Sequence, residues 1–337
     1  MHALVTGGGG FLGRAITEQL LARGDTVTIL SRSRYPDVEA LGARGVQVDL
    51  SAPDDTLSAA LEGVDIVFHV ASKTGVWGSR ESFFKANVEG TRNLVAAVQA
   101  AGVRRFVYTS SPSATFDGRD AEGKTEAEAP YPEHFESPYP ESKATAERFV
   151  LESNSTTFAT TALRPHLIWG PRDPHILPRL VTRHKQGRLM QIGDGTNRVG
   201  ITYIDNAAAA HLQAADALTP GAPHAGRAYF ITDLEPVSLW PWINGVLTGV
   251  DLPPIQRSVS PGLAKFAGGL LEWIWRTFDR PGEPPMTRFV AAEMATSHWY
   301  DLSAARADFG YAPPVGPDEG LQRALAWLRD ELAAGRL

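Results

Sequence analysis

Apolar positions follow two different periods along the first 170 residues. Runs of apolar and β-branched residues, each short enough for one buried strand, occupy positions 2–6, 26–30, 45–50, 65–71, 105–111 and 156–165. Apolar residues recur every three or four positions, as in amphipathic helices, at 11–24, 82–102 and 141–153. Nearly continuous apolar strands separated by helices are typical of a parallel sheet covered on both faces. Residues 1–170 are therefore predicted to form an α/β domain with a doubly wound parallel sheet, a Rossmann fold.

The pattern loosens after Pro171, where Gly, Pro and Trp become frequent and strand-like pieces such as "GRAYFI" mix with helical ones. Residues 171–337 are predicted to form a smaller substrate-binding lobe, partly interleaved with the first domain.

One segment of this second part, Gly262–Phe278, is mostly apolar, and its only charges are Lys265, Glu272 and Arg276. Its apolar residues lie three or four apart and form one broad stripe of a helix. A core or subunit-interface helix, a wall of an apolar substrate pocket and a membrane-surface contact all fit this pattern. We expect the helix to cover the substrate site with part of its apolar face toward the ligand.

Composition narrows the class of protein. The chain has 337 residues, 43% of them hydrophobic, and a net charge of −6 without a basic run, which argues against nucleic-acid binding. It has no cysteine, so disulfides and thiolate metal sites are excluded, and its nine histidines form no His-x-x-x-His pair. No metal site is expected.

The start "MHALVTGGGG" lacks the features of a secretory signal, and no apolar run reaches the roughly 20 residues of a membrane span, so a cytoplasmic location is expected.

A glycine-rich turn, "VTGGGGFLG", joins the first strand to the first helix. Gly7, Gly10 and Gly13 have the spacing that allows a tight turn and a close approach of backbone N–H groups to a pyrophosphate. The helix N-terminus adds a favourable partial positive charge. The turn predicts a dinucleotide-binding site that includes Gly7, Gly10, Phe11, Leu12 and Gly13.

The end of the second strand bears on the choice of dinucleotide. Where NAD sites carry an acidic residue for the ribose 2′-hydroxyl, this chain has Ser31, followed by Arg32 and Arg34. A guanidinium can bind a 2′-phosphate that a carboxylate would repel, so NADP(H) is favoured over NAD(H). Asp49, next to Leu50 after the third strand, is a candidate acceptor for the adenine amino group or a simple loop cap.

The stretch "SPYPESKATAERFV" places Tyr139 four residues before Lys143, so both side chains lie on one face of a helix. Pro140 is tolerated only in a first turn, which puts Tyr139 at the start of that helix.

Several ordered motifs together resemble the extended short-chain dehydrogenase/reductase superfamily. They are "TGGGGFLG", "ANVEGT", "YTSS", "YPESK" and "RPHLIWGPRDP". The last of these, with "TSSPSATFDG", is similar to the 3β-hydroxysteroid dehydrogenase branch. Within that branch the chain resembles sterol-4-carboxylate 3-dehydrogenases and the 2-alkyl-3-oxoalkanoate reductases of bacterial long-chain olefin synthesis.

The resemblance implies roles for the site residues. Tyr139 would be the general acid/base, with a pKa lowered from about 10 by the ammonium of Lys143, which also binds the nicotinamide ribose. Ser111 would hydrogen-bond the substrate oxygen, with Ser110 and Ser113 as alternatives, and Asn87 would support the active-site backbone. Further cofactor contacts are expected at Ala71, Ser72, Lys73, Pro165 and Leu167. His166 and Arg172 are candidates either for facing the substrate or for ordinary loop packing.

These expectations favour an NADP(H)-dependent reductase or dehydrogenase acting on an apolar β-keto acid or a sterol-like alcohol. Two rivals keep the fold: a nucleotide-sugar epimerase or dehydratase, and a non-catalytic NADP(H)-binding regulator. The intact Tyr139, Lys143 and Ser111 argue against the regulator, and the apolar segment Gly262–Phe278 argues against a sugar-nucleotide pocket. The resemblance also implies a homodimer formed through the helices that bear Asn87 and Tyr139; a partner enzyme or a membrane surface is a further possible contact.

Overall fold

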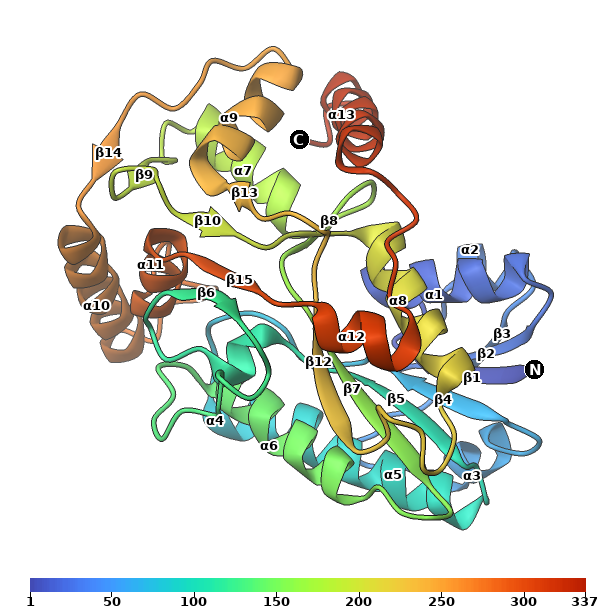
Figure 1. Ribbon diagram of the computed structural model, residues 1–337. Coiled ribbons are helices and arrows are strands. Elements are labelled where there is room, and N and C mark those ends of the chain that lie inside the picture. The colour runs from blue at the N-terminus through green and yellow to red at the C-terminus, as the bar shows by residue number, and fades with distance from the viewer.

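A seven-stranded parallel sheet forms the centre of the protein, whose computed structural model describes residues 1–337 (Figure 1). The strand order is β12-β7-β5-β4-β1-β2-β3, the arrangement of a doubly wound dinucleotide-binding sheet. The strands are β1 (His2–Thr6), β2 (Thr26–Ser31), β3 (Arg44–Gln47), β4 (Ile66–His69), β5 (Arg105–Thr109), β7 (Ala159–Pro165) and β12 (Arg227–Ile231). The predicted α/β doubly wound fold is confirmed.

Helices cover both faces of this sheet and create two separate cores. Side chains alternate along each strand, so that Val5 joins one core and Leu4 the other. The first core holds α1 (Phe11–Ala22) and α8 (Ile204–Ala217), and the second holds α5 (Gly90–Ala100) and α6 (Pro138–Glu152). Burial on both faces explains why the strands are apolar almost throughout.

The predicted helix over 82–102 is interrupted. The chain forms α4 (Arg80–Phe84), one π-helical turn η1 (Lys85–Glu89) and then α5. The π turn contains Asn87, whose side chain bonds the backbone of Lys73 after β4. Such π turns are frequent at functional sites, and no apolar period signals them.

The second part of the chain and the first exchange strands. β12 completes the main sheet, while β6 (Ala121–Lys124) joins β15 (His298–Tyr300), β10 (Arg198–Val199) and β13 (Val237–Ser238) in a four-stranded sheet. A short pair, β8 (Ile168–Trp169) with β11 (Thr202–Tyr203), connects the two parts, and a second pair, β9 (Gln191–Ile192) with β14 (Ser258–Val259), lies within the second part. The remaining helices are α2 (Pro36–Glu39), α3 (Asp55–Ala60), η2 (Pro112–Thr115), α7 (Ile176–Lys185), α9 (Leu239–Gly249), α10 (Pro261–Thr277), α11 (Arg288–Ala295), α12 (Ser303–Phe309) and α13 (Pro317–Ala333).

The helix predicted for Gly262–Phe278 is present as α10, but its expected orientation is wrong. Its large apolar side chains face solvent, with Phe266 71% and Trp273 58% exposed, whereas Glu272 is buried. The helix turns this way because Gly268 and Glu272 pack against the start of α11. None of the helices combines the length and the hydrophobicity that a membrane span requires.

Candidate active site

The predicted site residues gather at the carboxyl ends of adjacent parallel strands. Gly7 follows β1, Ala71 follows β4, Ser111 follows β5 and Pro165 ends β7. In doubly wound sheets this edge is where ligands bind.

The glycine turn has the shape that its sequence predicts. Gly7 adopts a φ of +67°, and a Cβ on it would come within 3.0 Å of the Cα of Ala71. A Cβ on Gly13 would lie 2.2 Å from the carbonyl oxygen of Gly7, so helix α1 can approach the turn only with glycine there. The amides of Phe11, Leu12 and Gly13 begin the helix and have no intrahelical acceptor, which leaves three N–H donors pointing out of its N-terminus.

Tyr35 is an unpredicted component of this turn. Its ring packs so close to Gly9 that a Cβ on Gly9 would lie 2.1 Å from the nearest ring carbon. The ring therefore closes the outer side of the turn, and the run of glycines is explained in part by this side chain rather than by the dinucleotide alone.

The two arginines after β2 differ in their partners. The guanidinium of Arg34 donates to Glu39, with the Nε–Oε1 distance at 2.7 Å. The exposed Arg32 side chain forms no hydrogen bond or ion pair. Of the two, Arg32 is the one available for a phosphate, while Ser31 uses its hydroxyl on the carbonyl oxygen of Ser33.

Asp49 caps its own loop. One carboxylate oxygen accepts from the N–H of Ser51 at 2.9 Å and from its hydroxyl at 2.7 Å, which lowers the pKa of Asp49. The neighbouring Leu50 contributes its carbonyl oxygen to the side chain of Asn93. Of the two alternatives for Asp49, the structure shows the loop cap.

Asn87 holds the loop after β4 in place. Its Oδ1 accepts from the N–H of Lys73 at 2.6 Å, and its Nδ2 donates to the carbonyl oxygen of Lys73 and to the hydroxyl of Ser142. The Lys73 side chain turns away to Ser82, with an Nζ–Oγ distance of 2.7 Å. Ser72 lies partly buried between Ala71 and Lys73 in the same loop.

Tyr139 and Lys143 lie in the first turns of α6, as predicted from their spacing. Lys143 is 2% exposed, donates to the carbonyl oxygen of Thr109 at the end of β5, and lies 4.3 Å from the centre of the Tyr108 ring. Tyr139 is half-buried and meets the edge of the Phe83 ring at a centroid distance of 6.2 Å. Their roles in catalysis stay a prediction.

Of the three candidate serines, Ser111 is the one beside Tyr139. Its hydroxyl interacts with the phenol and lies 2.8 Å from that of Ser113. Ser110 is buried toward Glu147, and Ser113 is buried behind Ser111. The geometry favours Ser111 for contact with a substrate oxygen.

The acidity of Tyr139 differs from the expectation. Burial raises the pKa of Tyr139 to about 12, with Ser111 acting to lower it and the nearby Glu293 carboxylate acting to raise it. Lys143 bonds Thr109 rather than the phenol, and the predicted lowering of the Tyr139 pKa by the ammonium is not found. Tyr139 is therefore a neutral phenol at physiological pH, the form that can donate a proton.

Burial also favours the neutral form of Lys143. Burial lowers the pKa of Lys143 to about 7, although the carboxylate of Glu147 acts to raise it. Glu147 itself is buried and pairs with Arg164 of β7 through two bonds of 2.6 and 2.9 Å. It also accepts from the hydroxyl of Tyr131. This pair fixes α6 against the sheet and places a negative charge behind the lysine.

Glu293 on α11 is the site residue that sequence reasoning missed. Its carboxyl forms no hydrogen bond, and its charge acts to raise the pKa of both Tyr139 and Tyr300. Burial raises the pKa of Glu293 to about 8, so it is largely protonated at neutral pH. Glu293 lies 154 residues beyond Tyr139 in the chain, and no local motif marks it.

In the loop after β7, the side chains of His166 and Arg172 are used in contacts within the protein. Pro165 is buried and Leu167 has a φ of +42°. His166 is buried and its Nε2 lies 2.6 Å from Nδ1 of His298, while Arg172 forms a bidentate ion pair with Glu18. Neither His166 nor Arg172 is turned toward Tyr139 as a free substrate-binding group.

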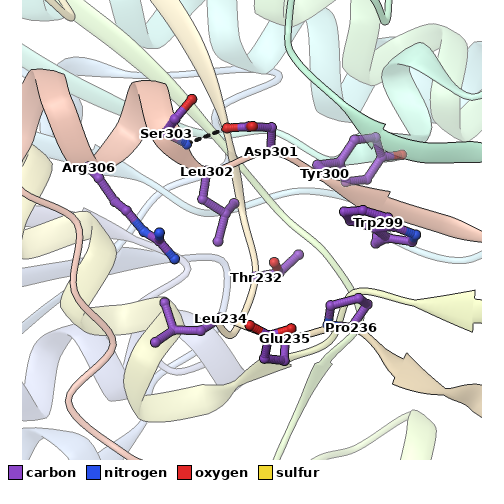
Figure 2. A pocket seen from close by; sticks show the side chains of 10 residues that line it. All are labelled: Thr232, Leu234, Glu235, Pro236, Trp299, Tyr300, Asp301, Leu302, Ser303 and Arg306. Atoms are coloured by element: carbon purple, nitrogen blue, oxygen red, sulfur yellow. Dashed lines mark hydrogen bonds between the residues drawn. The ribbon is translucent and has the colours of Figure 1, made fainter.

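A cleft of about 270 Å³ lies elsewhere, between the end of β12, β15 and α12 (Figure 2). Asp301, one of its two acidic residues with Glu235, accepts from the N–H of Ser303, the first residue of α12, at 2.6 Å. The cleft contains none of the predicted site residues, and we assign it no part in the site.

The residues present fit a nicotinamide dinucleotide. The free amides of α1 and the missing Cβ of Gly7 suit a pyrophosphate. The unpaired Arg32, after β2, suits the adenosine ribose and its 2′-phosphate, whereas Lys143 and Tyr139 suit the nicotinamide ribose and the nicotinamide. A cluster of acidic or histidine side chains that could hold a metal ion is absent.

Together, fold and site define an oxidoreductase of the extended short-chain dehydrogenase/reductase class whose residues fit a nicotinamide cofactor. Residues 4–259 match the 3-beta hydroxysteroid dehydrogenase/isomerase family, and the chain belongs to that family.

Two kinds of relative are similar over almost the whole chain. A 2-alkyl-3-oxoalkanoate reductase of Stenotrophomonas maltophilia is 47% identical over 96% of this chain and 98% of its own. A decarboxylating sterol-4-alpha-carboxylate 3-dehydrogenase of Mus musculus is 34% identical over 95% of this chain and 88% of its own.

Solved structures share the fold. The crystal structure of gox2253 has a TM-score of 0.77 and 29% identity, and the match covers 98% of each chain. A UDP-glucuronic acid 4-epimerase of Bacillus cereus in complex with NAD has a TM-score of 0.73 at 21% identity, over 98% of this chain and 99% of that one.

The burial of Lys143 gives a testable dependence of stability on pH. We expect Lys143→Met to raise the free energy of unfolding by on the order of 2–4 kcal/mol below pH 7 while abolishing most activity. Below pH 7 both folded and unfolded chains carry the ammonium, so the cost of burying it is fully present. Between pH 7 and about 10 only the unfolded chain stays protonated, so the gain shrinks as pH rises.

Denaturant unfolding of the wild type and the variant at several values between pH 6 and pH 10 measures this difference. Lys185→Met, which replaces an exposed lysine, is the matched control and should show no such trend. A difference for Lys143→Met that is constant with pH would contradict the assignment.

Proposed function

We propose that this enzyme uses NADPH to reduce the ketone of a 2-alkyl-3-oxoalkanoate to the secondary alcohol. The observation that carries the proposal is the neutral Tyr139 phenol next to Ser111, at the sheet edge where the glycine turn would hold the dinucleotide. The 47% identical relative supports this substrate class.

The chain's own groups perform the proton chemistry. Tyr139 donates its phenolic proton to the carbonyl oxygen, and Ser111 holds that oxygen by a hydrogen bond. When bound, the nicotinamide supplies the hydride to the carbonyl carbon. Lys143 lies one helical turn behind Tyr139 and can donate to a ribose hydroxyl in addition to Thr109.

Glu293 suits a substrate that carries a carboxylate. An ionised glutamate here would repel the acid group, but the raised pKa of Glu293 keeps it protonated at neutral pH. In that form it can donate a hydrogen bond to a carboxylate oxygen. Phe116 ends the η2 turn that Ser111 begins, and its ring centre lies 5.8 Å from that of Phe289; this aromatic pair is a candidate apolar wall for an alkyl chain.

One of the arguments made above against a nucleotide-sugar substrate does not hold, but the site offers no observation in favour of such a substrate. The apolar side chains of α10 face solvent, so they do not exclude a sugar nucleotide. The 47% identical relative, a 2-alkyl-3-oxoalkanoate reductase, is what favours the ketone reductase over this alternative. The epimerase structures are below 25% identical and show the fold alone.

Tyr139→Phe tests the proton donor. The variant keeps the ring and its contact with Phe83, so cofactor affinity should stay within about twofold while turnover of a 2-alkyl-3-oxoalkanoate falls by two to four decades. Stopped-flow and steady-state NADPH oxidation measure both. Tyr131→Phe, in which a phenol outside the reacting site is removed, separates a general loss of stability from a loss of the acid. A Tyr139→Phe enzyme with most of its turnover would refute the role.

Alanine variants of Arg32 and Arg34 together test whether the enzyme selects NADPH through its 2′-phosphate. Arg32→Ala should weaken NADPH binding by roughly 10- to 100-fold and leave NADH almost unchanged, because only NADPH carries the 2′-phosphate. Arg34→Ala should have a much smaller effect, since Glu39 already pairs with that guanidinium. Fluorescence titration with both cofactors measures this. A wild type that prefers NADH, or equal losses for both cofactors in Arg32→Ala, would overturn the NADP(H) assignment.

A further inference from the structure

Helix α10 exposes an apolar stripe, here called the α10 face, made of Leu263, Phe266, Leu270 and Trp273. These four side chains are 58%, 71%, 48% and 58% exposed. Their spacing of three and four residues keeps them on one side of the helix. Phe278, just beyond the helix and 65% exposed, extends the stripe and meets Trp273 edge to face at 6.4 Å.

The outward direction of this stripe is fixed by packing on the opposite side. A Cβ on Gly268 would lie 2.7 Å from the backbone of Thr287, so the two chain segments touch through a glycine. Glu272, which is 6% exposed, accepts from the backbone N–H of Arg288 at 2.7 Å and pairs with its guanidinium. Rotating the helix to bury the stripe would break both contacts and expose a paired buried carboxylate in the process.

The α10 face is attached to the segments around the site. Lys265 forms an ion pair of 3.0 Å with Glu136, three residues before Tyr139. Arg276 lies 5.2 Å from the ring of Trp77, in the loop after β4, and α11, which packs on α10, carries Glu293. In Figure 1, α10 and α11 lie together at one outer edge of the molecule, next to β6 and β15.

Charge and area indicate what covers the face. Arg276 and Arg280, at the end of the stripe, stack on the indole rings of Trp77 and Trp275 and form no ion pair, in a chain whose net charge is −6. Free cations beside exposed Trp, Phe and Leu are the composition of an in-plane amphipathic helix on an anionic bilayer. The exposed parts of the five side chains amount to on the order of 500 Å², below the ~800 Å² per partner of a stable protein interface.

We propose that the α10 face docks onto the surface of a phospholipid bilayer that contains anionic lipids. Its aromatic and leucine side chains enter the boundary between headgroups and acyl chains, and Arg276 and Arg280 lie at the phosphates. A shallow groove of about 460 Å³ along Phe266 and Leu270 gives an acyl chain a place to lie. The docking does not depend on the proposed reaction.

Vesicle flotation of the full-length protein tests the proposal. The probes are vesicles of phosphatidylcholine with phosphatidylglycerol and vesicles of phosphatidylcholine alone. The wild type should float with the anionic vesicles and bind the neutral ones at least several-fold more weakly. Phe266→Glu combined with Trp273→Glu should reduce binding by about a hundredfold or more, because each large side chain withdrawn from the apolar phase costs about tenfold or more.

Leu41→Glu is the matched control, since Leu41 is 48% exposed, as is Leu270, but lies outside the α10 face. It should bind vesicles as the wild type does, and all three proteins should keep the same thermal unfolding midpoint. No binding by the wild type, equal binding to both vesicle types, or equal binding by the double variant would overturn the proposal. So would a wild-type dimer in solution that the double variant loses, because a second copy would then cover the face.

Discussion

A single buried chain of hydrogen bonds sets the positions of the groups at the active site. It runs from the end of β1 through the end of β4 and the π turn to the start of α6, over Thr6, His69, Thr91, Asn87, Ser142 and the carbonyl oxygen of Tyr139. Burial lowers the pKa of His69 to about 3, so its ring is neutral. Since Thr91 donates to the carbonyl oxygen of Asn87, it must accept from Nε2–H of His69, which leaves Nδ1 to accept from Thr6. Every member then has a partner, and the hydrogen bonds join the end of β1, the loop after β4 and the start of α6.

Burial also decides the charges of the candidate catalytic groups. It raises the pKa of Tyr139 and Glu293 and lowers that of Lys143, so each is driven toward its neutral form. The one strong charge nearby, Glu147, is neutralised by Arg164. A neutral phenol beside a neutral carboxyl suits proton donation to a ketone of a carboxylate-bearing substrate. The same environment makes the burial of Lys143 unfavourable for stability, as is common for residues that proteins keep for activity.

Local patterns predicted those parts of the protein that local chemistry determines. The strand and helix periods, the glycine turn and the four-residue spacing of Tyr139 and Lys143 all act over a few neighbouring residues. The π turn at Asn87 was not predicted, because its purpose is a contact with Lys73, 14 residues away. Glu293 was missed because it lies 154 residues beyond Tyr139, and only the tertiary fold brings its charge close enough to act on the phenol. The direction of α10 was wrong for a related reason: the apolar stripe is the stronger signal in the sequence, but Gly268 and Glu272 have specific partners on α11 that decide which side is buried.

The proposed reaction is net hydride transfer to the C3 carbonyl of a 2-alkyl-3-oxoalkanoate, and isotope tracing follows this transfer atom by atom. The enzyme would be supplied with NADPH deuterated at C4, each face in turn, together with a synthetic 2-alkyl-3-oxoalkanoate, and the product examined by mass spectrometry and NMR. We predict a 3-hydroxy acid that carries deuterium at C3 from only one of the two labelled cofactors, formed in step with NADPH oxidation. A product without deuterium at C3, or isomerisation of a nucleotide sugar without net NADPH consumption, would contradict the account.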